Sequence, residues 1–207
     1  MNCTTFRKAA SAILLVSSLA IGSCNSGEPD TSDGDTTDTT STATSQDTAT
    51  NQDTNLSTGA EAVIASTYPD TSVTGTATFE IVNGKVKMTL NITAPAKANK
   101  SVAVHIHEHP GCGDNGKDAH GHWNPTKINH GKWGSDAFHS GDIGNVELDK
   151  DGKGSKELET DRWTIGGDST TNILNRSVIV HGGVDDFKTQ PTGNAGNRIG
   201  CGIINKK

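Results

Sequence analysis

Histidines crowd one stretch of this 207-residue chain, residues 102–142. Seven of the eight histidines lie there: His105, His107, His109, His120, His122, His130 and His139. The eighth, His181, lies further on and is followed by an acidic pair. Imidazole is the commonest side-chain ligand for zinc and copper, so this crowding in a chain of low aromatic content predicts metal binding. We expect a site for two metal ions.

The first pair of ligands is predicted from a period of two along residues 101–107. Apolar side chains occupy one face of the expected strand, and His105 and His107 occupy the other. The apolar residues are Val102, Val104 and Ile106. Residues i and i+2 on one strand face lie about 6.5–7 Å apart, so two rings can converge on one ion.

A second group follows in a segment rich in Gly, Asn and Lys. Its members are His122, His130, His139 and Asp142. Three imidazoles and one carboxylate suit a closed tetrahedral zinc site. Such an ion would give this loop a fixed shape, which its apolar content is too low to provide.

Six runs of sequence together resemble the copper,zinc superoxide dismutases, and the resemblance covers residues 60–205. The runs are VHIHEH (104–109), GHWNP (121–125), HG (130–131), FHSGDIGNV (138–146), VHGGVDDF (180–187) and GNAGNRIGCGII (193–204). Any one of them could arise by chance, but their joint order and spacing are specific.

The resemblance implies the two ligand sets, one for each ion. The implied copper ligands are His105, His107, His122 and His181. The implied zinc ligands are His122, His130, His139 and Asp142. The ring of His122 would bridge the two ions as an imidazolate.

Two further residues take their expected roles from the same resemblance. Asp185 falls where the family keeps an aspartate that hydrogen-bonds a copper-ligand and a zinc-ligand histidine, here His105 and His130, and so fixes ring orientation. Arg198 matches the arginine that stands beside copper and docks the anionic substrate; the alternative for it is a salt bridge or a structural contact to a loop carbonyl.

Several nearby side chains receive no chemical role. His109, His120 and Asp186 are left unassigned. Trp123 is interpreted as packing for the metal loop rather than as a cofactor contact.

The implied activity is dismutation of superoxide to oxygen and hydrogen peroxide, with copper cycling between oxidation states and zinc structural. His122 would detach from copper(I), take up a proton and return it to the departing peroxide. Two other classes stay open. A copper- and zinc-binding or buffering lipoprotein would need the histidines but not Arg198, and an adhesive β-sandwich would need neither.

The amino terminus resembles a bacterial lipoprotein signal. Arg7 and Lys8 precede an apolar run, residues 12–21, that is too short to span a bilayer as a helix. Small residues then precede Cys24, which we expect to carry the lipid once residues 1–23 are removed. The alternative is an ordinary secretory signal cut nearby. Either reading predicts export to the cell envelope of a bacterium, periplasmic or on the outer surface.

Residues 24–58 are predicted to form a disordered tether. Residues 25–57 are rich in Thr, Ser and Asp, with seven acids, no Lys or Arg and almost no apolar side chains. Subtracting those seven from the chain's 24 acids leaves 17, against 16 bases, in residues 59–207, so the expected domain is near neutral although the chain carries −6. This charge balance does not suggest nucleic acid as a partner.

The predicted domain, residues 59–207, reads as all-β. Residues 76–82 and 85–93 alternate around the turn pair Asn83-Gly84, and a second hairpin is expected around residues 149–154. Further strands are expected at 144–148, 177–181 and 202–205. The family specifies an eight-stranded antiparallel Greek-key barrel, with a long metal-binding loop, residues 108–141, and the loop 182–199 packed outside it.

Two cysteines remain for the predicted domain, Cys112 and Cys201, after Cys3 leaves with the signal and Cys24 takes the lipid. In an exported domain such a pair most simply forms a disulfide; the alternative is two free thiols. The short step from His107 to Cys112 resembles bacterial members of the family. Because those members differ in their subunit contacts, monomer and homodimer both stay open.

Overall fold

Residues 59–207 are described by a computed structural model. The predictions for the signal peptide, the lipidated Cys24 and the tether fall on residues 1–58 and lie outside the described residues. No helix within residues 59–207 is long and apolar enough to cross a membrane.

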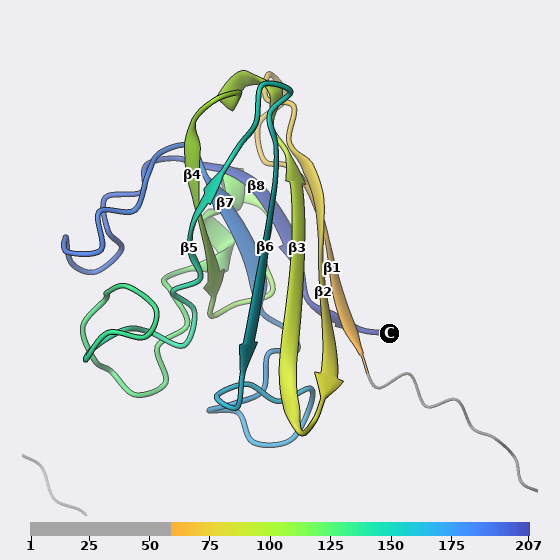
Figure 1. Cartoon of the computed structure of the whole chain (residues 1–207), viewed down its shortest axis with the longest axis vertical. Coiled ribbons are helices and arrows are strands. Elements are labelled where there is room, and N and C mark those ends of the chain that lie inside the picture. Colours follow the sequence, from red (N-terminus) through yellow and green to blue (C-terminus); the bar gives the residue numbers. More distant parts are fainter. Residues whose placement is uncertain (1–58) are drawn as a thin grey trace, which may run out of the picture. The chain divides into compact units, whose positions relative to one another are not determined.

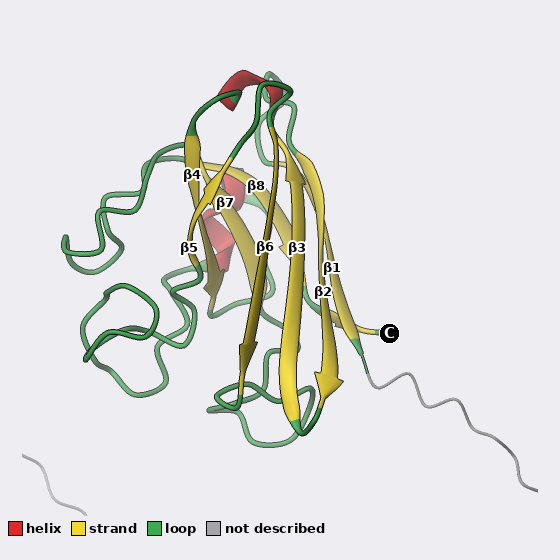
Figure 2. Ribbon diagram, in the orientation of Figure 1, coloured by secondary structure: helices red, strands yellow, loops and turns green. Residues whose placement is uncertain are grey.

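The described chain is built from short strands and two short 3₁₀ helices (Figures 1 and 2). The strands are β1 (Ala60–Ser66), β2 (Thr74–Val82), β3 (Lys85–Thr93), β4 (Ser101–His107), β5 (Gly144–Glu147), β6 (Lys153–Thr160), β7 (Ser177–His181), β8 (Arg198–Ile203) and β9 (Asn205–Lys206). The 3₁₀ helices are η1 (Pro95–Lys97) and η2 (Asp114–Ala119). The all-β prediction is confirmed.

Eight antiparallel strands follow the order β5-β4-β7-β8-β1-β2-β3-β6, and the two-residue β9 pairs with β1. The non-consecutive neighbours are the crossovers of a Greek-key arrangement. The two ends of this order approach each other, and the ammonium of Lys156 on β6 donates to the carbonyl of Asn145 on β5 at 3.0 Å. The barrel is therefore nearly closed, as predicted.

The β2–β3 hairpin forms where its turn pair predicted it. Asn83 and Gly84 both have positive φ, 50° and 78°, which is the requirement of a two-residue hairpin turn that matches strand twist. Val82 pairs with Lys85, and the ladder continues to Thr74 and Thr93.

The second hairpin prediction was only partly correct. A turn does form at residues 149–154, where the amide of Asp149 donates to the carbonyl of Lys153 at 2.8 Å. The flanking strands do not form a ladder with each other, however, because β5 pairs with β4 and β6 pairs with β3. The turn thus crosses between the two edges of the nearly closed barrel.

Strand β1 was not predicted from the sequence, although it lies in the middle of the strand order. Its buried face is Ala60, Ala62 and Ile64. Alanine is a weak strand former, so this alternation carried little signal. It nevertheless pairs with both β2 and β8, and the pairing with β8 helps to hold the strand that begins at Arg198.

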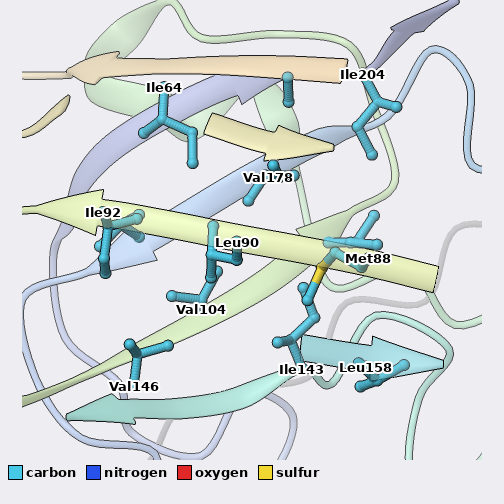
Figure 3. Close-up of a cluster of buried hydrophobic side chains, with 14 of the residues drawn as sticks. Ile64, Met88, Leu90, Ile92, Val104, Ile143, Val146, Leu158, Val178 and Ile204 are labelled. Carbon is cyan, nitrogen blue, oxygen red and sulfur yellow. The ribbon is translucent and has the colours of Figure 1, made fainter. Parts of the chain in front are cut away.

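The core fills the space between the strands (Figure 3). The predicted apolar face of β3 is at most 2% exposed: Val86, Met88, Leu90 and Ile92. The predicted apolar face of β4 joins the same cluster: Val102, Val104 and Ile106. With those side chains directed inward, the alternate residues of β4, His105 and His107, face the other side of the strand.

Two long loops carry most of the other site residues: the first holds five histidines and Asp142, and the second holds Asp185. One joins β4 to β5 and includes η2, and the other joins β7 to β8 (Figure 1). The predicted disulfide between Cys112 and Cys201 is present, with 5.6 Å between the Cα atoms. It ties the first loop to β8 and closes 89 residues, which stabilises the fold by about 4–5 kcal/mol in the chain-entropy model.

Candidate metal centre

Neighbouring strands bring together histidines that are far apart in the sequence. His105 and His107 come from β4, and His181 is the last residue of the adjacent β7. His122 reaches them from the loop because its backbone forms an isolated antiparallel bridge with His107. Regular strand pairing therefore positions one side of the site.

The first group of ligand atoms is formed by His105, His107, His122 and His181, all of them buried. The ring centroids of His105 and His122 lie 4.0 Å apart, and those of His107 and His181 lie 5.5 Å apart. The two Nε2 atoms of His107 and His181 approach to 3.4 Å. This is the ligand set that the resemblance implied for copper.

The second group consists of His122, His130, His139 and Asp142, also buried. One oxygen of Asp142 lies 2.8 Å from Nδ1 of His122 and 3.2 Å from Nδ1 of His139. Its other oxygen lies 3.0 Å from Nδ1 of His130. His122 belongs to both groups, which is the arrangement expected of a bridging ring.

The buried ring nitrogens show that these groups fit metal ions. Four of them have no hydrogen-bond partner within the described residues: Nδ1 of His105, Nε2 of His122, Nδ1 of His130 and Nδ1 of His139. Leaving a buried polar atom unsatisfied costs about 1–3 kcal/mol. Those of His130 and His139 lie close to Asp142 without the geometry of a hydrogen bond, so the donors converge on a common point, as ligands of one ion do.

The opposite nitrogens of the rings are each held by a protein acceptor. Nε2 of His105 and Nε2 of His130 donate to the two oxygens of Asp185, both at 2.9 Å. Three further rings donate to backbone carbonyls: His107 to His120, His139 to Ile128 and His181 to Gly196. These contacts set the tautomer that leaves each lone pair directed inward. Asp185 bridges the two residues that the resemblance implied.

Burial keeps most of these imidazoles neutral. It lowers the pKa of His105, His107 and His181, and it lowers the pKa of His122 to about 4. A neutral imidazole has the free lone pair that a metal needs, so these rings are ready to bind.

His130 differs because it lies between two carboxylates. Burial opposes its charge, but the nearby carboxylates of Asp142 and Asp185 outweigh burial and raise its pKa to about 9. Burial likewise opposes the charge of Asp142, yet close contacts with the surrounding histidines hold its pKa well below the usual range. The second group therefore offers a fully ionised carboxylate to a cation.

Three supporting residues were not found from the sequence. Gln190 brackets His130, accepting from its amide at 2.8 Å and donating to its carbonyl at 2.9 Å. The side chain of Asn145 makes the same pair of contacts with the backbone of Asp185. The indole of the buried Trp163 donates to the carbonyl of Ser140 at 2.9 Å, which anchors the metal loop to the core.

Arg198 begins β8 and pairs with His181 across a bulge. Its guanidinium donates to the carbonyls of Gly116, at 2.6 Å, and His120, at 2.5 Å. Contacts to loop carbonyls are the structural alternative that the sequence left open beside the substrate-docking role of Arg198. They also hold the guanidinium beside the first histidine group, because the carbonyl of His120 accepts from both Arg198 and His107.

Asp186 and Trp123 received no chemical role from the sequence, and both make structural contacts. Asp186 accepts from the amides of Lys188 and Thr189, both at 2.8 Å, and so shapes its own loop. Trp123 is 3% exposed in the core, under the guanidinium of Arg176.

A nearly closed Greek-key barrel with two buried ligand groups sharing one imidazole defines the class: an all-β protein with a binuclear, histidine-bridged metal centre. Residues 73–204 match the family model described as copper/zinc superoxide dismutase (SODC). The chain belongs to this family of enzymes, whose cofactors are copper and zinc.

Named relatives agree with this assignment. The chain is 38% identical over 144 residues to the copper-zinc superoxide dismutase of Yarrowia lipolytica, covering 65% of this chain and 91% of the relative. It is 34% identical over 145 residues to that of Deinococcus radiodurans, covering 64% and 77%. The crystal structure of the clock protein EA4 matches with a TM-score of 0.63 and 29% identity, covering 73% of this chain and 96% of that one.

Proposed function

We propose that this chain dismutates superoxide in the cell envelope of a bacterium, as an exported protein held by a lipid on Cys24. Two superoxide anions and two protons give one oxygen and one hydrogen peroxide. The observation that carries the proposal is that the buried His122 belongs to both ligand groups. Copper, held by the first group, would supply the one-electron chemistry, and zinc, held by the second, would fix the loop.

Arg198 is proposed to dock the anion. Its guanidinium lines a hollow of about 170 Å³ together with Tyr68, Asn115, Lys117, Gly196 and Asn197. Lys117 adds a second cation to this hollow, partly neutralised by Asp114 at 3.3 Å. A local positive field can attract a small anion even on a near-neutral domain.

His122 is proposed to carry the proton for the product. Its Nδ1 faces Asp142 of the second group, whereas its Nε2 is buried without a protein partner. Because His122 also belongs to the first group, Nε2 is the nitrogen left for that group. Nε2 is therefore the atom that can take up a proton and release it to peroxide. Asp142 holds the ring in place while this happens.

Export is supported by two independent features. The first 24 residues carry the lipoprotein-like signal. The disulfide between Cys112 and Cys201 is of a kind that persists in oxidising compartments and is rare in the cytosol.

Cys24→Ser should release the protein from membranes or block its processing, because the proposed anchor is a lipid on that thiol. A variant that is still processed and fractionates with membranes would exclude the lipid anchor.

The activity is tested by the rate of superoxide disappearance with protein loaded with copper and zinc, beside the same protein stripped of metal. We expect rapid dismutation only by the loaded protein. Negligible activity of protein that holds both metals would assign the chain to the metal-buffering alternative instead.

A further inference from the structure

Two histidines lie outside the binuclear centre and close to each other. The rings of His109 and His120 stack with 4.1 Å between centroids and 26° between planes, and both are exposed. The carboxylate of Glu108 joins them, and the three potential ligand atoms all lie within 4.8 Å of one another. Two imidazoles and a carboxylate are a competent donor set for a divalent transition metal.

The backbone holds this cluster in a fixed arrangement. Beyond the bridge between His107 and His122, the amide of Glu108 donates to the carbonyl of Gly121 at 3.1 Å. The amide of His109 then donates to the carbonyl of Ala119 at 3.2 Å. The two segments thus extend the pairing of β4, so the three side chains are presented by a short ladder rather than by a free loop.

His120 adopts a backbone conformation that normally requires glycine, with φ 60° and ψ −141°. A non-glycine residue in such a region is strained. Its carbonyl accepts from both His107 and Arg198, but glycine would offer the same carbonyl without the cost. The backbone contacts of this position therefore do not require an imidazole, whereas a ligand role does.

The donor atoms of the cluster are free to bind. Among residues 59–207, no hydrogen bond or ion pair engages the carboxylate of Glu108 or the ring nitrogens of His109 and His120. The nearby Arg176 donates to the backbone carbonyl of Glu108, at 3.2 Å, and not to its carboxylate. Gly121 has no side chain, and a Cβ there would lie 3.8 Å from the Glu108 carboxylate, which leaves that side open.

We propose that Glu108, His109 and His120 form a third, exposed metal site that binds Cu(II) most tightly and Zn(II) more weakly. The order follows from the general preference of nitrogen and oxygen donors among first-row divalent ions. Because three protein ligands at the surface leave the remaining positions to water, an ion here exchanges with solvent. The buried centre, in contrast, encloses its ions.

The test adds Cu(II) to the protein already holding one copper and one zinc, and follows its electron paramagnetic resonance spectrum. The parent should bind one additional Cu(II) per chain with nitrogen hyperfine structure. Six of the eight histidines belong to the buried centre, so the two in this cluster are the remaining source of imidazole.

His120→Gly and His109→Gln should each weaken this additional binding by about 100-fold or more, since loss of even an outer partner of a ligand costs 10- to 100-fold. His120→Gly also relieves the backbone cost, so it should keep both buried ions and unfold at the same or a higher temperature. Glu108→Gln should weaken binding as well, while the matched variant Glu80→Gln, an exposed glutamate on β2, should not.

A parent protein that takes up no third Cu(II) with nitrogen ligation would overturn the proposal. Equal binding by the parent, His120→Gly and His109→Gln would overturn it too, because the ion would then lie elsewhere.

Discussion

Arg198 shows at the scale of one residue how a structural contact and a chemical role can coincide. Two loop carbonyls hold its guanidinium, and neither neutralises its charge. Burial lowers the pKa of this group, but arginine starts far above neutral pH and stays a cation. The contacts therefore orient a charge that remains available to an anion in the adjoining hollow.

Replacing that charge should slow catalysis without emptying the metal centre. Arg198→Glu keeps every proposed ligand, and we expect its dismutation rate to fall by about 10- to 1,000-fold, the size of effect associated with electrostatic focusing. Arg198→Gln is the neutral comparison, because it removes the positive charge without introducing a negative one; its rate should fall less. Added salt should slow the parent and slow the glutamate variant less, or speed it. Full activity in a fully metallated Arg198→Glu protein would remove Arg198 from the mechanism.

His130 should report zinc binding through a proton. Without metal, the pKa of His130 is raised from 6.5 to about 9 by Asp142 and Asp185. The interaction of its charge with these carboxylates therefore stabilises the metal-free fold fully below pH 6.5, and this stabilisation is lost as the pH rises through about 9. A zinc ion needs the neutral ring. At about pH 7.5, zinc binding to metal-free protein should release close to one proton per chain from this residue, and release should vanish above about pH 10. An indicator dye in weak buffer measures it; zinc bound at the lower pH without proton release would contradict this protonation state.

Among the elements, the β7–β8 loop holds Asp185 against His130. It can do so only because the loop residue that packs against both of them is a glycine. Gly193 has φ 64°, and a Cβ on it would lie 1.8 Å from Oδ1 of Asp185 and 2.6 Å from Nε2 of His130. The loop must therefore shift if this residue gains a side chain.

Gly193→Ala should weaken zinc binding by about 10- to 100-fold, the usual cost of disturbing an outer partner of a ligand. Gly166→Ala is the matched control, since Gly166 also has positive φ, 94°, but a Cβ there would meet nothing within 4 Å. It should cost only the backbone strain, about 1–2 kcal/mol of stability, and leave zinc affinity unchanged. Competition titration with a chelator compares the two. Equal zinc affinity in both variants would exclude Gly193 as the residue that makes room for the hydrogen bond.

For the molecule as a whole, the features that could be predicted from the sequence were those that depend on neighbouring residues in the chain. The period of two in β4 predicted where His105 and His107 point, and Asn83-Gly84 predicted its hairpin. The two ligand sets were implied by the family resemblance, and the structure brings each set together.

Other parts could not be found because they depend on contacts between distant segments. Gln190 meets His130 across 60 residues, and nothing near Gln190 in the sequence marks it as a clamp for that loop. The alanine-rich β1 is a strand chiefly because β2 and β8 pair with it. The turn after β5 looks like a hairpin locally, but the pairing of its strands is decided by the edges of the barrel.

One chain should hold two different ions through a shared His122. Elemental analysis measures this on protein loaded with copper and zinc together, after dialysis against a weak chelator that strips exposed sites. We expect one copper and one zinc per chain, because the two buried groups together provide six imidazoles and one carboxylate in a closed arrangement. Retention of a single metal per chain would contradict it.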